Sequence, residues 1–253
     1  MANLTHSSFK QPQNPYTLLW RYMDLSKFVA LIQKSSLVFP RADKLGDPFE
    51  GSAPLPNIQA FRYVMDLRKS HPDQDPYKGL SDEQVSSIFS GASSFRRQAL
   101  LLNYMSCWHM NDSESAAMWK IYSKSSVAVC ITTDYHTLSS ILPDEVCMGE
   151  VEYVDYNSTY VDPINSFSFF MMKRKSFSHE KEARAIFADF EYWNDSNSPY
   201  IKEFSVPLNH LIKKIYVSPE SPDWFRDVVS DLVIKYGLDI PVQHSELNSV
   251  PLY

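Results

Sequence analysis

Residues 17–39 read TLLWRYMDLSKFVALIQKSSLVF, and this stretch decides the fold class. Five of its first seven residues are apolar or aromatic, which favours a strand. Asp24 or Ser26 can then cap a helix, whose apolar stripe is Phe28, Val29, Leu31 and Ile32. Residues 36–39 form a second short strand. A strand, a helix and a strand in such close succession predict a domain of α+β class.

The rest of the chain continues this alternation of elements. A helical pattern over residues 57–102 predicts a helical insertion with a Pro- and Asp-rich break at 71–78. Further strands are expected at 103–109, 126–132 and 148–156, a short helix at 162–172, and a last helix whose apolar stripe from Trp224 to Tyr236 packs in the core. We predict a polar N-terminal tail (1–16) and one α+β domain (17–253). Its central sheet should be largely antiparallel and flanked by helices.

The composition favours a soluble cytoplasmic protein. A chain of 253 residues with 44% hydrophobic content can bury the core of one large domain. Its three cysteines form no C-x-x-C pair, so we expect reduced thiols. The first fifteen residues lack the features of a signal peptide, and no apolar run is long enough to span a membrane.

Two common classes of partner are disfavoured. The net charge of −6 argues against a protein that binds nucleic acid by broad neutralisation of phosphates. The chain has only six glycines, and neither a P-loop nor a G-x-G-x-x-G motif is present. The usual glycine-rich phosphate loops are therefore excluded.

The best clue to function is the stretch 177–187, FSHEKEARAIF, where Glu180, Glu182 and Arg184 stand at alternate positions. On a strand, the period of two would put both carboxylates and the guanidinium on one face. Carboxylates so close raise one another's pKa, as they often do at catalytic sites. On a helix, Glu180 and Arg184 would form an ordinary i, i+4 salt bridge. The local sequence leaves both interpretations open.

Further polar candidates lie earlier in the chain. Arg21 stands in an apolar strand and needs an anion if it is buried. That anion is either Asp47 or Glu50 of the turn LGDPFE (45–50), or a phosphate or carboxylate of a ligand. Asp47 and Glu50 could also bind a metal ion, but helix capping by Asp47 is favoured and no metal is predicted. His109 could serve as a general acid or base.

Three aromatic residues surround a polar turn, namely Trp108, Trp119 and Tyr122. Such residues usually belong to the core. The alternative is a platform on which a nicotinamide, adenine or nucleobase ring stacks.

Five short motifs follow one another along the chain. They are residues 19–22 (LWRY), 45–50 (LGDPFE), 106–108 (SCW), 118–122 with Met118, Trp119 and Tyr122, and 180–184 (EKEAR). In this order they resemble a bacterial family known as domain of unknown function 2971. The chain departs from the family pattern at Gly46, where asparagine is usual, and at His109, where a small polar residue is commoner.

A more distant resemblance implies an activity. The early strand, helix and strand with the late E-x-E look like the Arg-Ser-Glu class of ADP-ribosyltransferases, whose sheet is split. The resemblance implies NAD as substrate, with Arg21 on its pyrophosphate, Ser106 supporting the pocket and Glu182 stabilising the ribosyl cation. Glu180 would orient or activate the acceptor. The remaining NAD-binding residues would be Tyr22, Trp108, Trp119, Tyr122 and Arg184, with Asp47, Glu50 and His109 near the substrate.

These observations predict an NAD-dependent ADP-ribosyltransferase or NAD glycohydrolase, used in a bacterial defence or toxin system. Arg21 and the E-x-E segment should then line one cleft. One alternative is a metal-dependent enzyme acting on nucleotides or nucleic acid, with Asp47, Glu50, Glu180 and Glu182 around the ion. Another is a noncatalytic sensor of a ligand or protein. The acceptor and the oligomeric state are not predicted.

Overall fold

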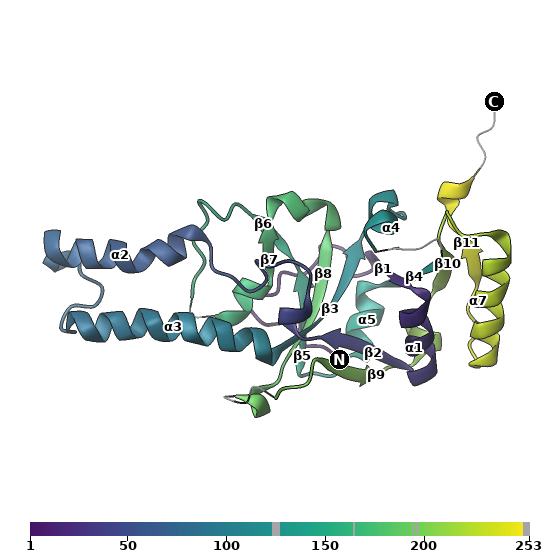
Figure 1. The fold of residues 1–253 in the computed structure, drawn as a ribbon, viewed down its shortest axis with the longest axis horizontal. Helices are drawn as coiled ribbons and strands as arrows, with labels where there is room; N and C mark the ends of the chain where they lie inside the picture. The colour runs from purple at the N-terminus through teal and green to yellow at the C-terminus, as the bar shows by residue number, and fades with distance from the viewer. Residues whose placement is uncertain (123–126, 164, 194, 196, 250–253) are drawn as a thin grey trace.

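The computed structural model describes every residue except 123–126, 164, 194, 196 and 250–253. The fold has the expected α+β class, with a central seven-stranded sheet surrounded by helices (Figure 1). Neighbouring strands of this sheet are antiparallel except for the pair β10 and β11.

The strands of the central sheet lie in the order β11-β10-β4-β1-β3-β8-β5. Their bounds are β1 Leu18–Asp24, β3 Asn103–Met110, β4 Ala128–Asp134, β5 Val146–Glu150, β8 Glu182–Ala188, β10 Lys214–Val217 and β11 Val242–His244. Two smaller sheets pair β2 (Ser36–Pro40) with β9 (Ile201–Ser205), and β6 (Glu152–Val154) with β7 (Met172–Arg174).

Seven α-helices and six short 3₁₀ helices complete the described part of the chain. The α-helices are α1 Leu25–Lys34, α2 Leu55–Ser70, α3 Asp82–Leu102, α4 Ala116–Tyr122, α5 Tyr135–Ile141, α6 Leu208–Leu211 and α7 Asp223–Lys235. The 3₁₀ helices are η1 Ala42–Lys44, η2 Pro72–Gln74, η3 Ser166–Phe170, η4 Lys175–Glu180, η5 Phe190–Tyr192 and η6 Glu246–Asn248. None of the described helices is both long and apolar enough to cross a membrane.

Strand β1 lies in the middle of the sheet, between β4 and β3, and the alternation of its side chains defines two faces. We call the face that carries Leu19 and Met23 the α1 face, because these residues share a core cluster with the buried side of α1. The other, the α4 face, carries Trp20 and Tyr22, which cluster with Trp119 of α4. The position of a residue along its strand therefore decides on which face its side chain lies, for core residues and functional candidates alike.

Several expected elements differ from the structure. The strand expected at 148–156 is divided into β5 and β6, which belong to different sheets. The helix expected at 162–172 is the short η3. In α7 the core side is narrower than expected: Phe225 is buried, whereas Trp224 is 60% exposed and Tyr236 41% exposed. An apolar pattern cannot tell which of its members the neighbouring elements reach.

The N-terminal segment packs against the domain, although its polar sequence predicted a tail. Ala2 and Phe9 are buried, and Asn3 and Lys10 form isolated bridges with residues of β5. The Asn3 amide donates to Val146 O, and the Glu150 amide donates to Lys10 O. The segment thus covers β5, which ends the sheet on this side and would otherwise expose its backbone.

Gly149 of β5 provides a test of this packing. A Cβ atom at this position would lie 2.9 Å from the Lys10 carbonyl oxygen and 2.9 Å from backbone atoms of Phe9. We expect Gly149→Ala to lower the free energy of unfolding by about 1–3 kcal/mol, because backbone atoms cannot move aside as a side chain can. Urea denaturation measures the change. Gly91→Ala, where nothing lies within 4 Å of the added Cβ, should be neutral or stabilising; equal losses in both variants would contradict the explanation.

Helices α2 and α3 form an arm that extends away from the sheet (Figure 1). They occupy the stretch expected to be helical, and Ser81 begins α3 with the expected capping box to Gln84. Arg68 joins the two helices at the tip, with ion pairs to Asp75 (2.9 Å) and Asp82 (3.1 Å).

Candidate functional site

Glu180, Glu182 and Arg184 do not all lie on one strand. Glu180 ends η4, Lys181 adopts a left-handed conformation with φ 39°, and β8 begins at Glu182. Glu182 and Arg184 therefore share one face of the sheet, while Glu180 approaches from the preceding turn. The helical salt bridge between Glu180 and Arg184 was the wrong alternative, because Arg184 pairs with other carboxylates.

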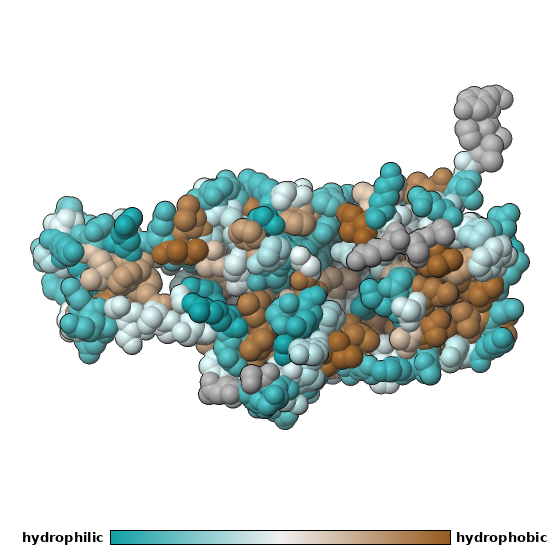
Figure 2. All heavy atoms as spheres, viewed as in Figure 1, coloured by the Kyte–Doolittle hydropathy of each residue, from teal (hydrophilic) through white to brown (hydrophobic). Residues whose placement is uncertain are grey.

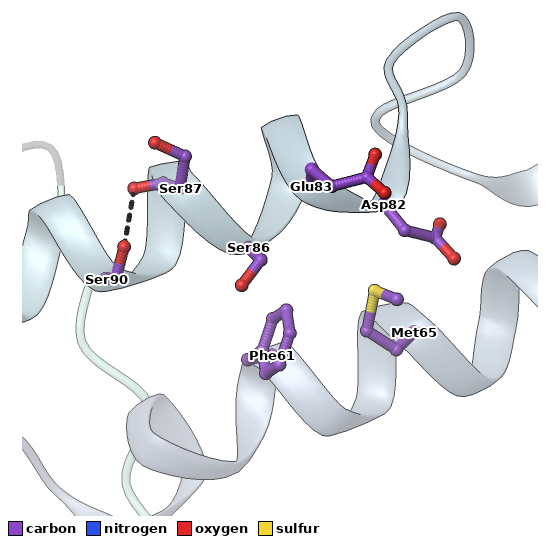
Figure 3. A pocket seen from close by; sticks show the side chains of 7 residues that line it. All are labelled: Phe61, Met65, Asp82, Glu83, Ser86, Ser87 and Ser90. Atoms are coloured by element: carbon purple, nitrogen blue, oxygen red, sulfur yellow. Dashed lines mark hydrogen bonds between the residues drawn. The ribbon is translucent and has the colours of Figure 1, made fainter.

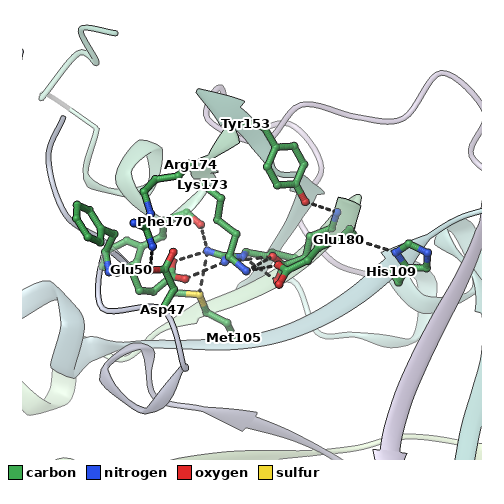
Figure 4. Close-up of polar contacts among 12 residues, drawn as sticks. Asp47, Glu50, Met105, His109, Tyr153, Phe170, Lys173, Arg174 and Glu180 are labelled. Carbon is green, nitrogen blue, oxygen red and sulfur yellow. Dashed lines mark hydrogen bonds and ion pairs between the residues drawn. The ribbon is translucent and has the colours of Figure 1, made fainter. Parts of the chain in front are cut away.

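Arg184 is the centre of a buried network of charges, and Figure 4 labels three other members of it, Glu50, Lys173 and Glu180. Its side chain is fully buried. It binds Glu50 through two contacts, Nη1–Oε1 at 2.5 Å and Nη2–Oε2 at 2.9 Å, and its Nε donates to Glu182 Oε1 at 3.1 Å. Nη1 also donates to the Phe170 carbonyl oxygen at 2.5 Å. This bidentate geometry is the strong form of an arginine–carboxylate pair.

Lys173 of β7 is the second cation of the network. Its Nζ forms an ion pair with Glu182 Oε2 at 3.0 Å and another with Glu180. Three carboxylates (Glu50, Glu180 and Glu182) thus face two cations, which leaves one formal negative charge in the network. Sequence reasoning missed Lys173, because a run of basic residues such as 173–175 usually faces water. One signal in the sequence pointed to Lys173: acids outnumber bases among the candidate site residues, so a further basic partner is needed if the acids are buried.

The network keeps Glu182 ionised. Burial alone would raise the pKa of Glu182, but attraction to Arg184 and Lys173 lowers it to about 2. Glu50 responds in the opposite direction, because burial raises its pKa by more than Arg184 lowers it. The pKa values of Glu50 and Glu182 are therefore shifted in opposite directions, although the two carboxyl groups belong to one network.

A pocket of about 460 Å³ lies beside this network. Glu182 lines it, together with Tyr153, Lys181 and Asn111. The Glu182 amide donates to the Tyr153 hydroxyl at 2.8 Å, and Lys181 Nζ donates to Asn111 Oδ1 at 3.0 Å. Glu182, whose carboxylate is almost fully buried, is thus a residue of the wall of a cavity large enough for a small molecule.

His109 lies directly across from Glu182 in the pairing of β3 with β8. Its Nδ1 contacts the Glu180 carbonyl oxygen at 2.6 Å, and its Nε2 is buried without a hydrogen-bond partner. A carbonyl oxygen only accepts, so Nδ1 carries the proton and Nε2 holds a free lone pair. Burial lowers the pKa of His109. The imidazole is a neutral base, although it does not line the pocket.

The aromatic candidates of α4, Trp119 and Tyr122, differ in burial. Trp119 is buried and packs edge-on against Tyr22, with ring centroids 4.9 Å apart, so it is a core residue. Tyr122 is 43% exposed at the end of α4. Burial of its hydroxyl and the nearby Glu180 charge raise the pKa of Tyr122. Tyr122 therefore lies close to the carboxylates and is accessible to a ligand.

Arg21, Ser106 and Trp108 lie on the opposite face of the sheet. Trp20 pairs with His109, which itself pairs with Glu182, so these three side chains share the α4 face. Arg21 alternates with Trp20 and contacts Trp108, with its Cζ 5.4 Å from the ring centroid, on the α1 face. The prediction of one cleft lined by Arg21 and Glu182 was wrong. Strand alternation within β1 was predictable, but the register that decides which face meets Glu182 was not.

Arg21 has neutral partners instead of the expected acids. Its Nη1 donates to Ser106 Oγ at 3.0 Å, and its Nη2 donates to the Val38 carbonyl oxygen at 3.0 Å. Burial lowers the pKa of Arg21 to about 10. The predicted salt bridge to Asp47 or Glu50 was wrong, because Asp47 binds Arg174 at 3.0 Å and Glu50 binds Arg184.

The described residues contain no group of three or more His, Cys, Asp and Glu side chains positioned to hold a metal ion. Each acid of the metal-dependent alternative instead has a basic partner, which is Arg174 for Asp47, Arg184 for Glu50, and Lys173 for both Glu180 and Glu182. A metal ion would have to displace these cations.

No protein-family model matches this chain, and no curated protein matches it. The function is therefore inferred from the geometry of the α4 face.

Proposed function

We propose that the pocket beside Glu182 binds a ribosyl substrate and that the protein cleaves or transfers at its C–N glycosidic bond, with NAD as the substrate. The observation that carries the proposal is Glu182, a residue of the pocket wall whose buried carboxylate is held ionised by Arg184 and Lys173. A fixed negative charge in a largely buried site favours the positive charge that develops on ribose as the bond breaks.

The reaction with water balances without another reagent. The bond between ribose C1′ and the nicotinamide nitrogen breaks, and its electron pair stays with nicotinamide. A water oxygen then bonds to C1′ and releases one proton. Glu182 acts by charge alone, so it needs no proton of its own. Another acceptor in place of water would make the reaction a transfer.

Two other residues have roles in this proposal: Lys181, which lines the pocket, and Tyr122 of α4, which is not one of its lining residues. Lys181 is exposed and lines the pocket, so it takes the diphosphate in place of Arg21. Tyr122 offers an exposed ring against which nicotinamide can stack. A cytoplasmic location and a role in bacterial defence extend the same proposal; the three free cysteines support the former.

Release of nicotinamide from NAD is the test. The wild-type protein should release it, and Glu182→Gln should lower kcat about a hundredfold, the usual cost of losing one charge-stabilising group. Lys181→Ala should raise KM about tenfold with little change in kcat. Lys120→Ala, an exposed lysine of α4, is the matched control and should retain both constants. Circular dichroism checks that each variant is folded.

The proposal fails if the folded wild-type protein releases no nicotinamide. If Glu182→Gln does not fold, the KM change in Lys181→Ala still decides whether this pocket binds the substrate. An unchanged KM in that variant would exclude the assigned diphosphate position.

A second candidate function is noncatalytic recognition of a ligand. It is favoured by one observation: both oxygens of Glu182 already accept from Arg184 or Lys173. Such a carboxylate can be structural. Thermal-shift measurements with NAD, ADP-ribose, nucleotides and divalent ions detect binding whether or not the ligand is turned over. A stabilising ligand without release of nicotinamide would support recognition rather than catalysis.

A further inference from the structure

The arm formed by α2 and α3 exposes many apolar side chains for a pair of helices. The buried residues of these helices are Val64, Val85, Ala99 and Leu102, and the last two lie at the end of α3 that leads into β3. Ile58 is 63% exposed, and Ile88 is 45% exposed. Helices of this length gain most of their stability from packing an apolar side against a partner. The two helices of the arm therefore leave part of their apolar surface uncovered.

One side of the arm is hollowed between the two helices (Figure 3). The hollow measures about 540 Å³ and is lined by Phe61 and Met65 of α2 and by Asp82, Glu83, Ser86, Ser87 and Ser90 of α3. In the space-filling view an apolar patch lies between the two helices, with hydrophilic residues at the tip of the arm (Figure 2). Ile58, Phe61 and Met65 follow the spacing i, i+3, i+7, so they form one apolar ridge along α2. Beside this ridge, α3 presents three serines and, at its N-terminal end, Asp82 and Glu83.

On this side of α3, two residues of opposite charge lie at equal distances from Ser90. Glu83 and Arg97 lie seven residues before and after Ser90, and seven residues are close to two turns, so all three share one side of the helix. Glu83 and Arg97 are roughly 21 Å apart along the axis at about 1.5 Å per residue. Both are exposed, and among the described residues neither forms an ion pair.

We propose that the arm binds the arm of a second copy of this chain, with the two α3 helices antiparallel and crossing at Ser90. A two-fold axis through this point places Glu83 of each copy opposite Arg97 of the other. The small serine side chains let the two helices approach closely, and the ridge of Ile58, Phe61 and Met65 packs against the partner's α3. The four helices then form an antiparallel bundle with a common core. An interface between two identical copies repeats each contact on both sides of its two-fold axis. The charges at Glu83 and Arg97 are complementary about Ser90 in this way.

The mass of the protein in solution tests the proposal. Sedimentation of the wild-type protein should give twice the monomer mass at micromolar concentration. Ile58→Glu combined with Met65→Glu should give the monomer with unchanged helical content, because Ile58 is 63% exposed in the single copy and Phe61, which packs against Phe89 within the arm, is kept. A monomeric wild type, or a dimer that survives this double substitution, would overturn the proposal.

Charge exchange tests the antiparallel arrangement separately. Glu83→Arg alone should weaken dimerisation at least about tenfold, since it turns two attractive pairs into repulsive ones. Arg97→Glu should do the same, and the variant with both substitutions should regain the wild-type dissociation constant. Arg226→Glu on α7 is the control and should have no effect. Failure of the combined variant to recover would exclude the crossing at Ser90. None of these measurements depends on the proposed enzymatic activity.

Discussion

Replacing Arg184 with methionine is expected to lower the free energy of unfolding by about 3–5 kcal/mol, the usual cost of breaking a buried ion pair from one side. The reason is the pair of carboxylates that remains. Glu50 and Glu182 are both almost fully buried, and Arg184 is the cation that they share. Lys173 would still face Glu182 but does not contact Glu50 in any ion pair of the described residues. Urea denaturation at neutral pH measures the loss.

Two controls define what this loss means. Arg226→Ala removes an exposed arginine whose ion-pair partner is the adjacent Asp227, and it should cost less than about 1 kcal/mol. Replacing Arg184, Glu50 and Glu182 together with apolar residues of similar size should recover much of the stability, because no charge is then left buried alone. A loss below about 1 kcal/mol for Arg184→Met would show that water reaches the network and compensates the carboxylates.

The contrast between Arg21 and Arg184 shows which features the sequence could predict. Both arginines stand in strands, and their alternation with apolar neighbours is visible in the chain. Local pattern therefore predicted the strand at 17–23 and the capped helix after it, and these are present as β1 and α1. The partners of the two arginines were not visible. Those partners depend on how β1, β3 and β8 align, and a shift by one residue would exchange the faces.

The cations of the site illustrate the same limit. Lys173 lies seven residues before Glu180 in the chain, but β7 joins a small sheet with β6, and this pairing turns Lys173 inward. Glu50 reaches Arg184 across 134 residues of sequence. Motif reasoning found the acids because they cluster at short spacing. It missed the base that neutralises them because a run of basic residues usually faces water.

Acid should destabilise the wild-type protein through Glu182. Its pKa is about 2 in the folded protein and has an ordinary value of 4.5. A carboxyl group whose pKa is lowered by folding contributes stability above the unfolded pKa, and this contribution disappears as the pH falls toward the folded pKa. The difference of 4.5 − 2 = 2.5 in pKa corresponds to about 3 kcal/mol at about 1.36 kcal/mol for each unit. The loss should occur between about pH 4.5 and pH 2.

Glu50 acts in the opposite direction, since its pKa is raised by burial and its protonation relieves an unfavourable buried charge. The measurement must therefore compare variants rather than follow the wild type alone. Unfolding free energies of the wild type and of Glu182→Gln, measured in urea at several pH values, should converge as the pH falls below 4.5, because the amide has no proton to gain. Glu220→Gln, an exposed position, should follow the wild-type profile. Parallel profiles for the wild type and Glu182→Gln down to pH 2 would show that Glu182 is not held ionised by Arg184 and Lys173, and the charge on which the proposed chemistry depends would be absent.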